Sequence, residues 1–562
     1  MTRKILLTLT LVVALTIFVL LPPAAHDSPQ PEWNYGWPVV KGAIHVHSAR
    51  SDGIGTIDEI AASAAAAGLQ FVIITDHGDG TRAPDPPSYR SGVLTIDAVE
   101  VSASNGHYLA LGLPQMPFRL AGDARDVIED VTRFDGFGIA AHPTSRREAL
   151  RWYDWEAPFN GLEWLNADSE WRDESWMTLA RGVLAYPFRP TEALATLLDR
   201  PEEALARWDA LTRRRHVTGI AGADAHARLS DEYEDYGIAR IPSYESSFRV
   251  FVNHVILEHP LSGDAARDAN SLLSSIYAGR VFSSIEGLAR LGRFGVTALS
   301  AGLVARPGEY IDSEHPVGLD ATISAPPKTT MVVLRDGAPI YETTEGKLRI
   351  DVGTTPATYR IEARLDGRTN ATSVPWLVTN PIYVNLRAAH TAKKPETAPP
   401  PVTERTGVAT ESWRAEAASG CDSMLSPGTL EDGTPGLQWR LRLAEGRPFS
   451  QFSAIWFPAN QGIATHDRLQ LRARADRPMR LWAQLRGPAA NGREQRWARS
   501  FYLGPELRTV DLRLSEFRGI DPPSNEPPPM EKVDSLLLVV DTLNTLPGTA
   551  ATISIAELWL VK

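Results

Sequence analysis

Apolar runs that lead into histidines or carboxylates recur along the first half of this 562-residue chain. The first is KGAIHVHSARSDG at 41–53, where apolar residues alternate with His45 and His47. Because alternate residues of a strand project from the same face, both imidazoles are predicted to reach one metal ion. A second run at 69–75 leads into TDHG and His77. One such pair alone is weak evidence, since short motifs often mark ordinary core or surface histidines.

The same pattern occurs at four further places, where strand-like runs deliver Glu100, follow His107, or end at His142 and at the GADAH motif. The complete set of ligand-type residues is His45, His47, Asp52, His77, Glu100, His107, His142, Asp224 and His226. These side chains offer nitrogen and oxygen donors and no thiolate. Such a set suits two or three divalent ions such as Zn, Mn or Fe.

The sequence between these motifs predicts alternating strands and helices. TIDE at 56–59 is a capping box, in which the Thr hydroxyl and the Glu carboxylate satisfy free amides at a helix start. The helix is expected from Ile57 to Ala67, with Gly68 as its C-cap, before the strand at 69–75. A second helix is predicted from Asp123 to Phe134. Because strand, helix and strand form a parallel crossover unit, the ligand-type residues are expected at one mouth of a barrel.

Through HVHSARSDG, TDH, AHP and GADAH, the chain resembles the polymerase and histidinol phosphatase (PHP) superfamily over about 41–288. The resemblance implies a distorted (β/α)7 barrel, here at 38–290, with a trinuclear site at the C-terminal mouth of the strands. The first metal would be bound by His45, His47, Glu100 and Asp224. Glu100 would bridge to a second metal, which His107 and His142 hold. The third would be bound by Asp52, His77 and His226.

Hydrolysis is the reaction expected from such a site, because clustered divalent ions activate water and neutralise charge on the attacked group. The resemblance makes a small phosphoester the leading substrate, with Glu100 and Asp224 acting through a metal-activated water. Exported members that this chain resembles, the carbaryl-hydrolase-like enzymes, instead cleave carbamate or carboxylic esters with the same ligands. The remaining alternative is a non-catalytic envelope or glycan-binding protein, which the full ligand set opposes because structural sites are closed and four-coordinate.

Several side chains near the ligands are candidate substrate contacts. Arg146, Arg147 and Arg228 follow ligand-bearing strands and could meet a phosphate bidentately, although loop arginines are also common as solvated surface. Five tryptophans surround Glu163 of the strand GLEWLN, namely Trp152, Trp155, Trp164, Trp171 and Trp176. They predict either an aromatic wall for an aryl or sugar-bearing ester, or ordinary packing of rings against the barrel.

The first 25 residues are predicted to be a signal peptide or an N-terminal anchor. Arg3 and Lys4 precede an uncharged run from Ile5 to Leu21, which is at the lower limit for spanning a bilayer. We therefore expect export to the periplasm or the extracellular space, with the segment either cleaved or retained at the membrane. The single Cys421 neither supports nor opposes export. A net charge of −11 argues against a nucleic-acid partner.

After about residue 288 the sequence changes to short alternating runs separated by Gly, Pro and Asp. We predict an immunoglobulin-like β-sandwich at 291–386, a Pro-rich linker at 387–410 and a jelly-roll, carbohydrate-binding-like domain at 411–562. The strands expected in the first sandwich are 317–323, 329–335, 347–352 and 357–365.

One face of the C-terminal domain is predicted to carry arginines and to point outward. By alternation, the residues of this face are Arg472, Arg474, Arg480, Trp482, Gln484 and Arg486. The face is either solvated surface or the concave side of a module that binds a glycan or cell-envelope component. In the second case Trp482 and Arg486 would contribute most.

Overall fold

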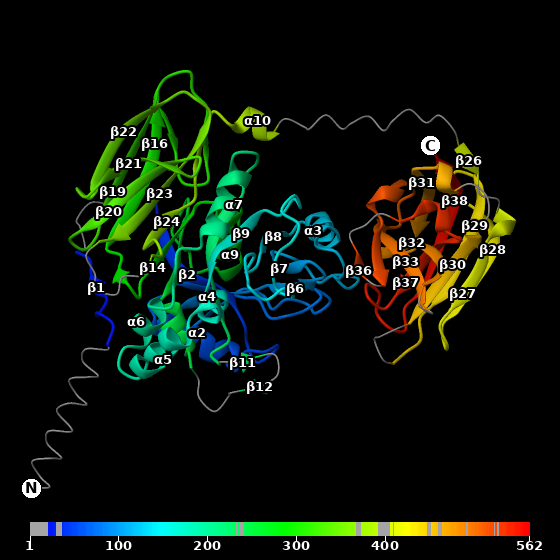
Figure 1. The fold of residues 1–562 in the computed structure, drawn as a ribbon, viewed down its shortest axis with the longest axis horizontal. Helices are drawn as coiled ribbons and strands as arrows, with labels where there is room; N and C mark the ends of the chain where they lie inside the picture. The colour runs from blue at the N-terminus through cyan, green and yellow to red at the C-terminus, as the bar shows by residue number, and fades with distance from the viewer. Residues whose placement is uncertain are drawn as a thin grey trace, which may run out of the picture. The chain divides into compact units, whose positions relative to one another are not determined.

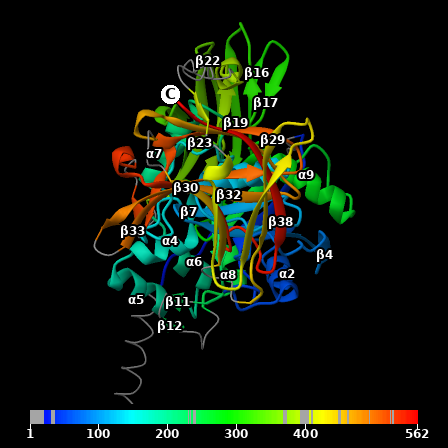
Figure 2. The ribbon, with the colours of Figure 1, turned by 90° about the vertical axis from the view of Figure 1, so that its right-hand side faces the viewer.

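The computed structural model of the chain describes residues 21–29, 36–228, 230–231, 234–235, 241–366, 373–391, 405–407, 410–446, 451–458, 463–490, 493–521, 523–524 and 528–562. It divides into two compact units. The first unit comprises 1–78, 84–114 and 131–392. The second comprises 79–83, 115–130 and 393–562. Both units are rich in strands, as the ribbon shows in two views (Figures 1 and 2), so the prediction of a multidomain, β-rich chain is confirmed.

The first unit is built on a sheet whose strands close on themselves and carry the predicted ligands. Its strands are β2 (Val39–Val46), β3 (Phe71–Ile74), β4 (Ser88–Arg90), β5 (Val93–Asp97), β6 (Val99–Ala103), β7 (Gly106–Leu111), β8 (Phe137–Ala140), β9 (Gly161–Asn166), β10 (Thr218–Ala225), β13 (Phe251–Ile256) and β14 (Val281–Ile285). Pairing is parallel between β2 and β3, β3 and β5, β8 and β9, β9 and β10, and β10 and β2. The (β/α)7 barrel type remains a prediction.

Most helices lie between these strands along the chain. The helices are α2 (Ile57–Ala66), α3 (Ala124–Arg133), α4 (Ala167–Asp173), α5 (Trp176–Ala185), α6 (Pro190–Ala195), α7 (Glu202–Thr212), α8 (Tyr244–Phe248), α9 (Ala265–Tyr277) and α10 (Arg387–Thr391). The capping box is confirmed, since Thr56 and Glu59 each bond the other's backbone amide at the start of α2. No described helix is both long enough and apolar enough to cross a membrane.

Most strands after residue 288 either extend this closed sheet or form a separate four-stranded sheet in the first unit. Their bounds are β15 (Ala289–Arg290), β16 (Arg293–Ser300), β17 (Leu303–Ala305), β18 (Tyr310–Ile311), β19 (Val317–Ser324), β20 (Thr329–Arg335), β21 (Ala338–Thr343), β22 (Lys347–Gly353), β23 (Ala357–Leu365), β24 (Leu377–Thr379) and β25 (Ile382–Val384). The four strands expected here are confirmed as β19, β20, β22 and β23. Three short strands complete the unit: β1 (His26–Asp27), β11 (Ser230–Asp231) and β12 (Glu234–Asp235). The immunoglobulin-like type of this region remains a prediction.

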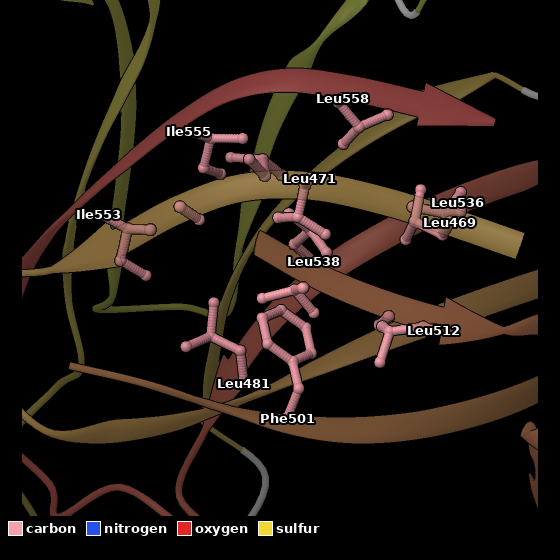
Figure 3. Packing of buried hydrophobic residues seen from close by; sticks show 14 of the residues in the cluster. Leu469, Leu471, Leu481, Phe501, Leu512, Leu536, Leu538, Ile553, Ile555 and Leu558 are labelled. Atoms are coloured by element: carbon pink, nitrogen blue, oxygen red, sulfur yellow. The ribbon is translucent and has the colours of Figure 1, made fainter. Parts of the chain in front are cut away.

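The second unit contains two sheets of antiparallel strands. Its strands are β26 (Arg405–Gly407), β27 (Arg414–Ala417), β28 (Asp422–Thr429), β29 (Pro435–Arg442), β30 (Phe452–Pro458), β31 (Arg468–Ala475), β32 (Met479–Ala490), β33 (Arg493–Leu503), β34 (Arg508–Arg513), β35 (Arg518–Asp521), β36 (Pro523–Ser524), β37 (Ser535–Asp541) and β38 (Ala550–Val561). Leu471, Leu481, Phe501, Leu538 and Ile553 interdigitate in its core (Figure 3). The prolines Pro399–Pro401 of the predicted linker lie outside the described residues.

The predicted outward arginine face is wrong in two respects. Arg472 and Arg474 lie on β31, whereas Arg480 and Arg486 lie on β32, and these strands belong to different sheets. The arginines therefore lie on two different sheets and do not form the single predicted face. Alternation along a strand cannot reveal this, because it reports which side a residue takes and not which sheet its strand joins.

Arg480 is also buried instead of solvated, with a side-chain exposure of 0%. Its guanidinium donates from Nε to Asp130 Oδ2 at 2.7 Å and from Nη2 to Asp130 Oδ1 at 2.8 Å. Nη1 donates to Ser500 Oγ at 2.7 Å and lies 3.1 Å from Asp126 Oδ1. These acids belong to segment 115–130 of the same unit, which is remote in sequence and covers this part of β32. Glycan binding by the C-terminal domain remains a prediction.

Candidate metal centre

The predicted ligands gather where strands of the first unit end. His45 and His47 come at the end of β2, Asp224 at the end of β10, and His142 just after β8. His77 follows β3 and forms an isolated parallel bridge with Glu100 of β6. Parallel strands bring their carboxyl ends to one edge, so residues separated by up to about 180 positions can meet there.

Three of these residues depart from regular strand geometry. His45, His142 and Asp224 have φ angles of 70°, 30° and 40°, in the left-handed region that non-glycine residues rarely adopt. Such conformations cost about 1–3 kcal/mol each and persist where the surrounding structure enforces them. The rings of His45 and His47 still converge, with centroids 5.1 Å apart. This convergence was predicted from alternation along a regular strand, but in the structure His45 has a left-handed backbone conformation.

Glu100 occupies the centre of the cluster and is almost fully buried. Its Oε1 lies 2.8 Å from His107 Nδ1 and 3.0 Å from His142 Nε2. Its Oε2 lies 3.1 Å from both His45 Nε2 and His47 Nε2. Each carboxylate oxygen thus faces a different pair of imidazoles, which is the arrangement that a bridging ligand requires.

Two aspartates extend the cluster on either side of His47. Asp224 Oδ1 lies 3.3 Å from His45 Nε2 and 3.4 Å from His47 Nε2. Asp52 Oδ2 lies 3.1 Å from His226 Nε2 and 3.6 Å from His77 Nε2. All nine predicted residues fall into overlapping groups that could hold an ion: His47, Asp52, His77 and His226; His45, His47 and Asp224; His45, Glu100 and His142; and His77, Glu100 and His107. Their role as ligands remains a prediction.

The charges in this cluster shift the titration of its members. Burial alone would lower the pKa of His45, but the nearby carboxylates of Asp224, Glu163 and Glu100 outweigh burial and raise that pKa well above its ordinary value. Burial alone would raise the pKa of Glu100, but the imidazoles, His45 foremost, hold it well below the usual range. Opposed carboxylates and imidazoles therefore favour a charged cluster.

The donor set fits divalent metal ions. Four of the imidazoles and two of the carboxylates are buried together, which is costly unless positive charge compensates the acids. His47 Nε2 is buried and makes no hydrogen bond to any described residue, although Glu100 Oε2 lies 3.1 Å away. A buried nitrogen that faces acidic oxygens without a hydrogen bond is available to bind a metal ion.

The predicted substrate arginines lie on the loops that follow ligand-bearing strands. Arg146 is exposed and Arg147 half-buried in the loop after β8, and Arg228 is half-buried after β10. None of the three belongs to a metal-holding group among the described residues. Substrate contact by these arginines remains a prediction.

The five tryptophans do not form one wall. Trp152 and Trp164 are buried in the core, where their indole N–H groups donate to Asp154 O at 2.7 Å and Ser283 Oγ at 3.4 Å. Trp155 and Trp171 stack with the guanidinium groups of arginines, while Trp176 is 76% exposed. The aromatic wall is therefore wrong for at least Trp152 and Trp164, which pack the interior as aromatic rings usually do.

No family model matches the chain and no curated protein matches it. Among solved structures, it is similar to a two-domain protein from Bacteroides vulgatus containing a predicted PHP-like metal-dependent phosphoesterase, at 15% identity over 64% of this chain and 99% of that one, with a TM-score of 0.29. It is also similar to a family 11 carbohydrate-binding module from Clostridium thermocellum, at 10% identity over 28% and 95% of the two chains and a TM-score of 0.23.

The sequence reasoning missed Glu163 of β9 as a member of this site. Its Oε1 lies 2.7 Å from His45 Nδ1, and its Oε2 accepts the backbone N–H of His142 at 2.6 Å. Asn166 Nδ2 donates to the same Oε2 at 2.7 Å and lies 3.2 Å from Asp224 Oδ2. A carboxylate inside an apolar strand, GLEWLN, was the available signal, because a buried acid needs partners.

Asp76, within the TDH motif, was missed as well. Its Oδ1 and Oδ2 accept the backbone N–H and the hydroxyl of Ser48, both at 2.6 Å. Ser51 Oγ donates to Asp76 Oδ1 at 2.9 Å, and Tyr244 OH donates to the carbonyl of His47 at 2.7 Å. These contacts hold the loop after β2 in place, and with it Asp52.

Proposed function

We propose that this chain is an exported metal-dependent hydrolase that uses two or three divalent ions to cleave a small phosphoester. The observation that carries the proposal is the shared carboxylate Glu100, which faces four imidazole nitrogens at 2.8–3.1 Å. A single structural ion is closed by four ligands, whereas a carboxylate with distinct partners on each oxygen suits adjoining ions. The sequence motifs that supply the other ligands resemble those of the PHP superfamily, and this resemblance favours phosphoester chemistry.

Each group of the chain has a role in this proposal. When bound, divalent ions supply Lewis-acid chemistry that activates water and neutralises charge on the attacked group. Glu163 holds His45 through Nδ1, which aims Nε2 toward Glu100 and Asp224. Arg147 and Arg228, on the loops after β8 and β10, would orient phosphate oxygens through charge-assisted hydrogen bonds.

Hydrolysis of a carbamate or carboxylic ester on the same ligands is the alternative. Besides the resemblance to carbaryl-hydrolase-like enzymes, the predicted aromatic wall favoured it, and two of the rings of that wall, Trp152 and Trp164, are interior packing residues. A phosphoester remains the better-supported substrate for that reason. A substrate panel separates the two: p-nitrophenyl phosphate, its diester, naphthyl acetate and a naphthyl carbamate, assayed side by side on one sample. A strong preference for the carbon esters would overturn the phosphoester assignment.

Metal analysis tests the enzyme proposal against a non-catalytic envelope protein. After loading with Mn or Zn, the chain should retain more than one ion per molecule and hydrolyse at least one substrate of the panel. His47→Gln should lower both metal content and turnover. His254→Gln is the matched control, because His254 is equally buried on the neighbouring strand β13 and donates to or accepts from Ser284 Oγ at 2.8 Å, outside the metal-holding groups. Less than one ion bound, with no hydrolysis, would refute the proposal.

A further inference from the structure

Helix α5 (Trp176–Ala185) and the turn after it carry an apolar face that is open to solvent in the first unit. Trp176, Val183 and Leu184 are 76%, 63% and 64% exposed. Met177 and Phe188 extend the same face, at 59% and 58% exposure. We call these residues the α5 face: Trp176, Met177, Val183, Leu184 and Phe188. Large apolar side chains gathered this closely on one surface usually mark an interaction site.

The α5 face is not the result of a poorly packed helix. The other side of α5 is in contact with the protein, where Gly182 and Ala185 are buried. Ser175 caps the helix by accepting the backbone N–H of Thr178 at 3.2 Å. Tyr186, at the C-terminal end, bonds through its hydroxyl to Ser246 Oγ at 2.8 Å. The helix is thus formed and held on one side, and its apolar residues point away from the side that is held.

The start of the described chain lies beside the turn after this helix and beside α6. The guanidinium group of Arg189, which follows α5, donates to the carbonyl of Pro22. The backbone N–H of Ala25 donates to Glu192 Oε1 of α6 at 3.2 Å. Helix α6 begins five residues after α5 ends and lies against it (Figure 1). The described chain therefore begins next to the turn between α5 and α6, and the uncharged run Ile5–Leu21 directly precedes this point in the sequence.

The apolar run that precedes the described chain indicates what could cover the α5 face. An apolar run of 17 residues from Ile5 to Leu21 is the part of the chain most suited to hydrocarbon. Where it meets the folded unit, a membrane would also meet the side chains of α5. A tryptophan at one end of the face and the exposed Arg181 beside it match the composition of helices that lie in the lipid interface.

We propose that the α5 face lies on the surface of a lipid bilayer, in which the Ile5–Leu21 run anchors the chain. The two contacts reinforce each other, because a single weak anchor holds a protein only marginally and a second nearby contact acts at high effective concentration. The first unit would then be held in a defined orientation at the membrane, not tethered freely. A second copy of the chain is the competing occupant, and the experiment separates the two.

The test places a fluorophore on the α5 face of the full chain. In a Cys421→Ser background, Leu184→Cys and Leu303→Cys are each labelled with an environment-sensitive dye. Leu303 is the matched control, since it is an exposed leucine of the same unit, at 49%, on β17 (Figure 2). The protein is reconstituted with vesicles of phosphatidylcholine and phosphatidylglycerol at 3:1, with and without acyl-chain spin-labelled lipid.

A lipid contact predicts a blue-shifted emission at position 184 that spin-labelled lipid quenches several-fold more strongly than the emission at position 303. Equal quenching at both positions, or none at position 184, would overturn the proposal. Shielding of position 184 that depends on protein concentration and not on lipid would assign the face to a second copy. As a second readout, Leu184→Glu should reduce protection of α5 from hydrogen exchange on vesicles, while Leu303→Glu should not.

Discussion

Glu163→Gln is the most informative substitution in the metal centre, because it keeps the size of the side chain while it removes the negative charge and reduces the number of hydrogen bonds that the side chain can accept. Glu163 is 1% exposed, and three donors converge on its two oxygens. His45 approaches Oε1 through Nδ1 at 2.7 Å. The backbone N–H of His142 and the Asn166 amide approach Oε2 at 2.6 and 2.7 Å. A carboxylate accepts all three donors, whereas a carboxamide offers one accepting oxygen and one NH₂ group.

The expected loss of metal affinity follows from this mismatch between donors and acceptors. If the glutamine oxygen takes the position of Oε2, its NH₂ group faces His45 Nδ1. His45 can satisfy that donor only as the tautomer with the proton on Nε2, the nitrogen that lies 3.1 Å from Glu100 and would bind the metal. If the amide takes the reverse orientation, its NH₂ group faces the two buried donors at the Oε2 position, the His142 N–H and the Asn166 amide. Leaving one buried donor unpaired costs about 1–3 kcal/mol. We therefore expect metal affinity to fall about 10–100-fold, as for other residues that orient histidine ligands.

The assay is a competition titration of Zn against a chromogenic chelator at neutral pH, with unfolding by denaturant measured on the same protein without metal. Glu286→Gln is the control. Glu286 is also a largely buried acid of this unit, at 13% side-chain exposure, but it pairs with Lys41 at 2.8 Å and is outside the metal-holding groups. An affinity for Zn that is unchanged in Glu163→Gln would refute the reasoning, whatever the effect on stability.

Three further predictions concern both units. Asp224→Ala should abolish turnover and lower metal content while leaving circular dichroism unchanged, because Asp224 contacts two imidazoles and no core residue is removed. Arg480→Met should lower the free energy of unfolding by about 3–5 kcal/mol in denaturant titrations, since it leaves buried acids unpaired; Arg474→Met, at a 31% exposed side chain, should cost less than about 1 kcal/mol. Burial raises the pKa of Asp541 from 3.8 to about 6. The folded state therefore keeps the Asp541 carboxyl protonated up to a higher pH than the unfolded state does. The stabilisation that this protonated carboxyl gives is present below about pH 4 and is lost as pH rises through 6. Asp541→Asn should stabilise the protein by about 1–3 kcal/mol at pH 7 and not at pH 4, as measured by denaturant unfolding at both pH values.

Much of the local structure could be predicted from short-range patterns. The capping box at Thr56 and Glu59 depends only on residues within one helical turn, and the structure contains it. The strands 329–335 and 357–365 were predicted at their observed bounds from alternation and turn residues. Local patterns succeed at these places because the interactions that decide them lie within a few residues of one another.

Contacts between distant segments could not be predicted in this way. Glu163 meets His45 across 118 positions, and the N–H of His142 across 21. Arg480 was expected in solvent because its strand alternates, yet Asp126 and Asp130 of a segment some 350 residues earlier bury it. Alternation predicts two sides of a strand but not what covers each side.

The sequence by itself determined which side chains of this protein could hold metal ions, because each motif combines an apolar run with a donor at its end. Only the tertiary structure decided that these donors meet, around Glu100, with left-handed backbone at His45, His142 and Asp224. It also decided that the apolar residues of α5 stay uncovered beside the start of the described chain. The physical reason is the same in both cases: a residue type depends on the local chain, whereas its partners depend on strand pairing and packing over hundreds of residues.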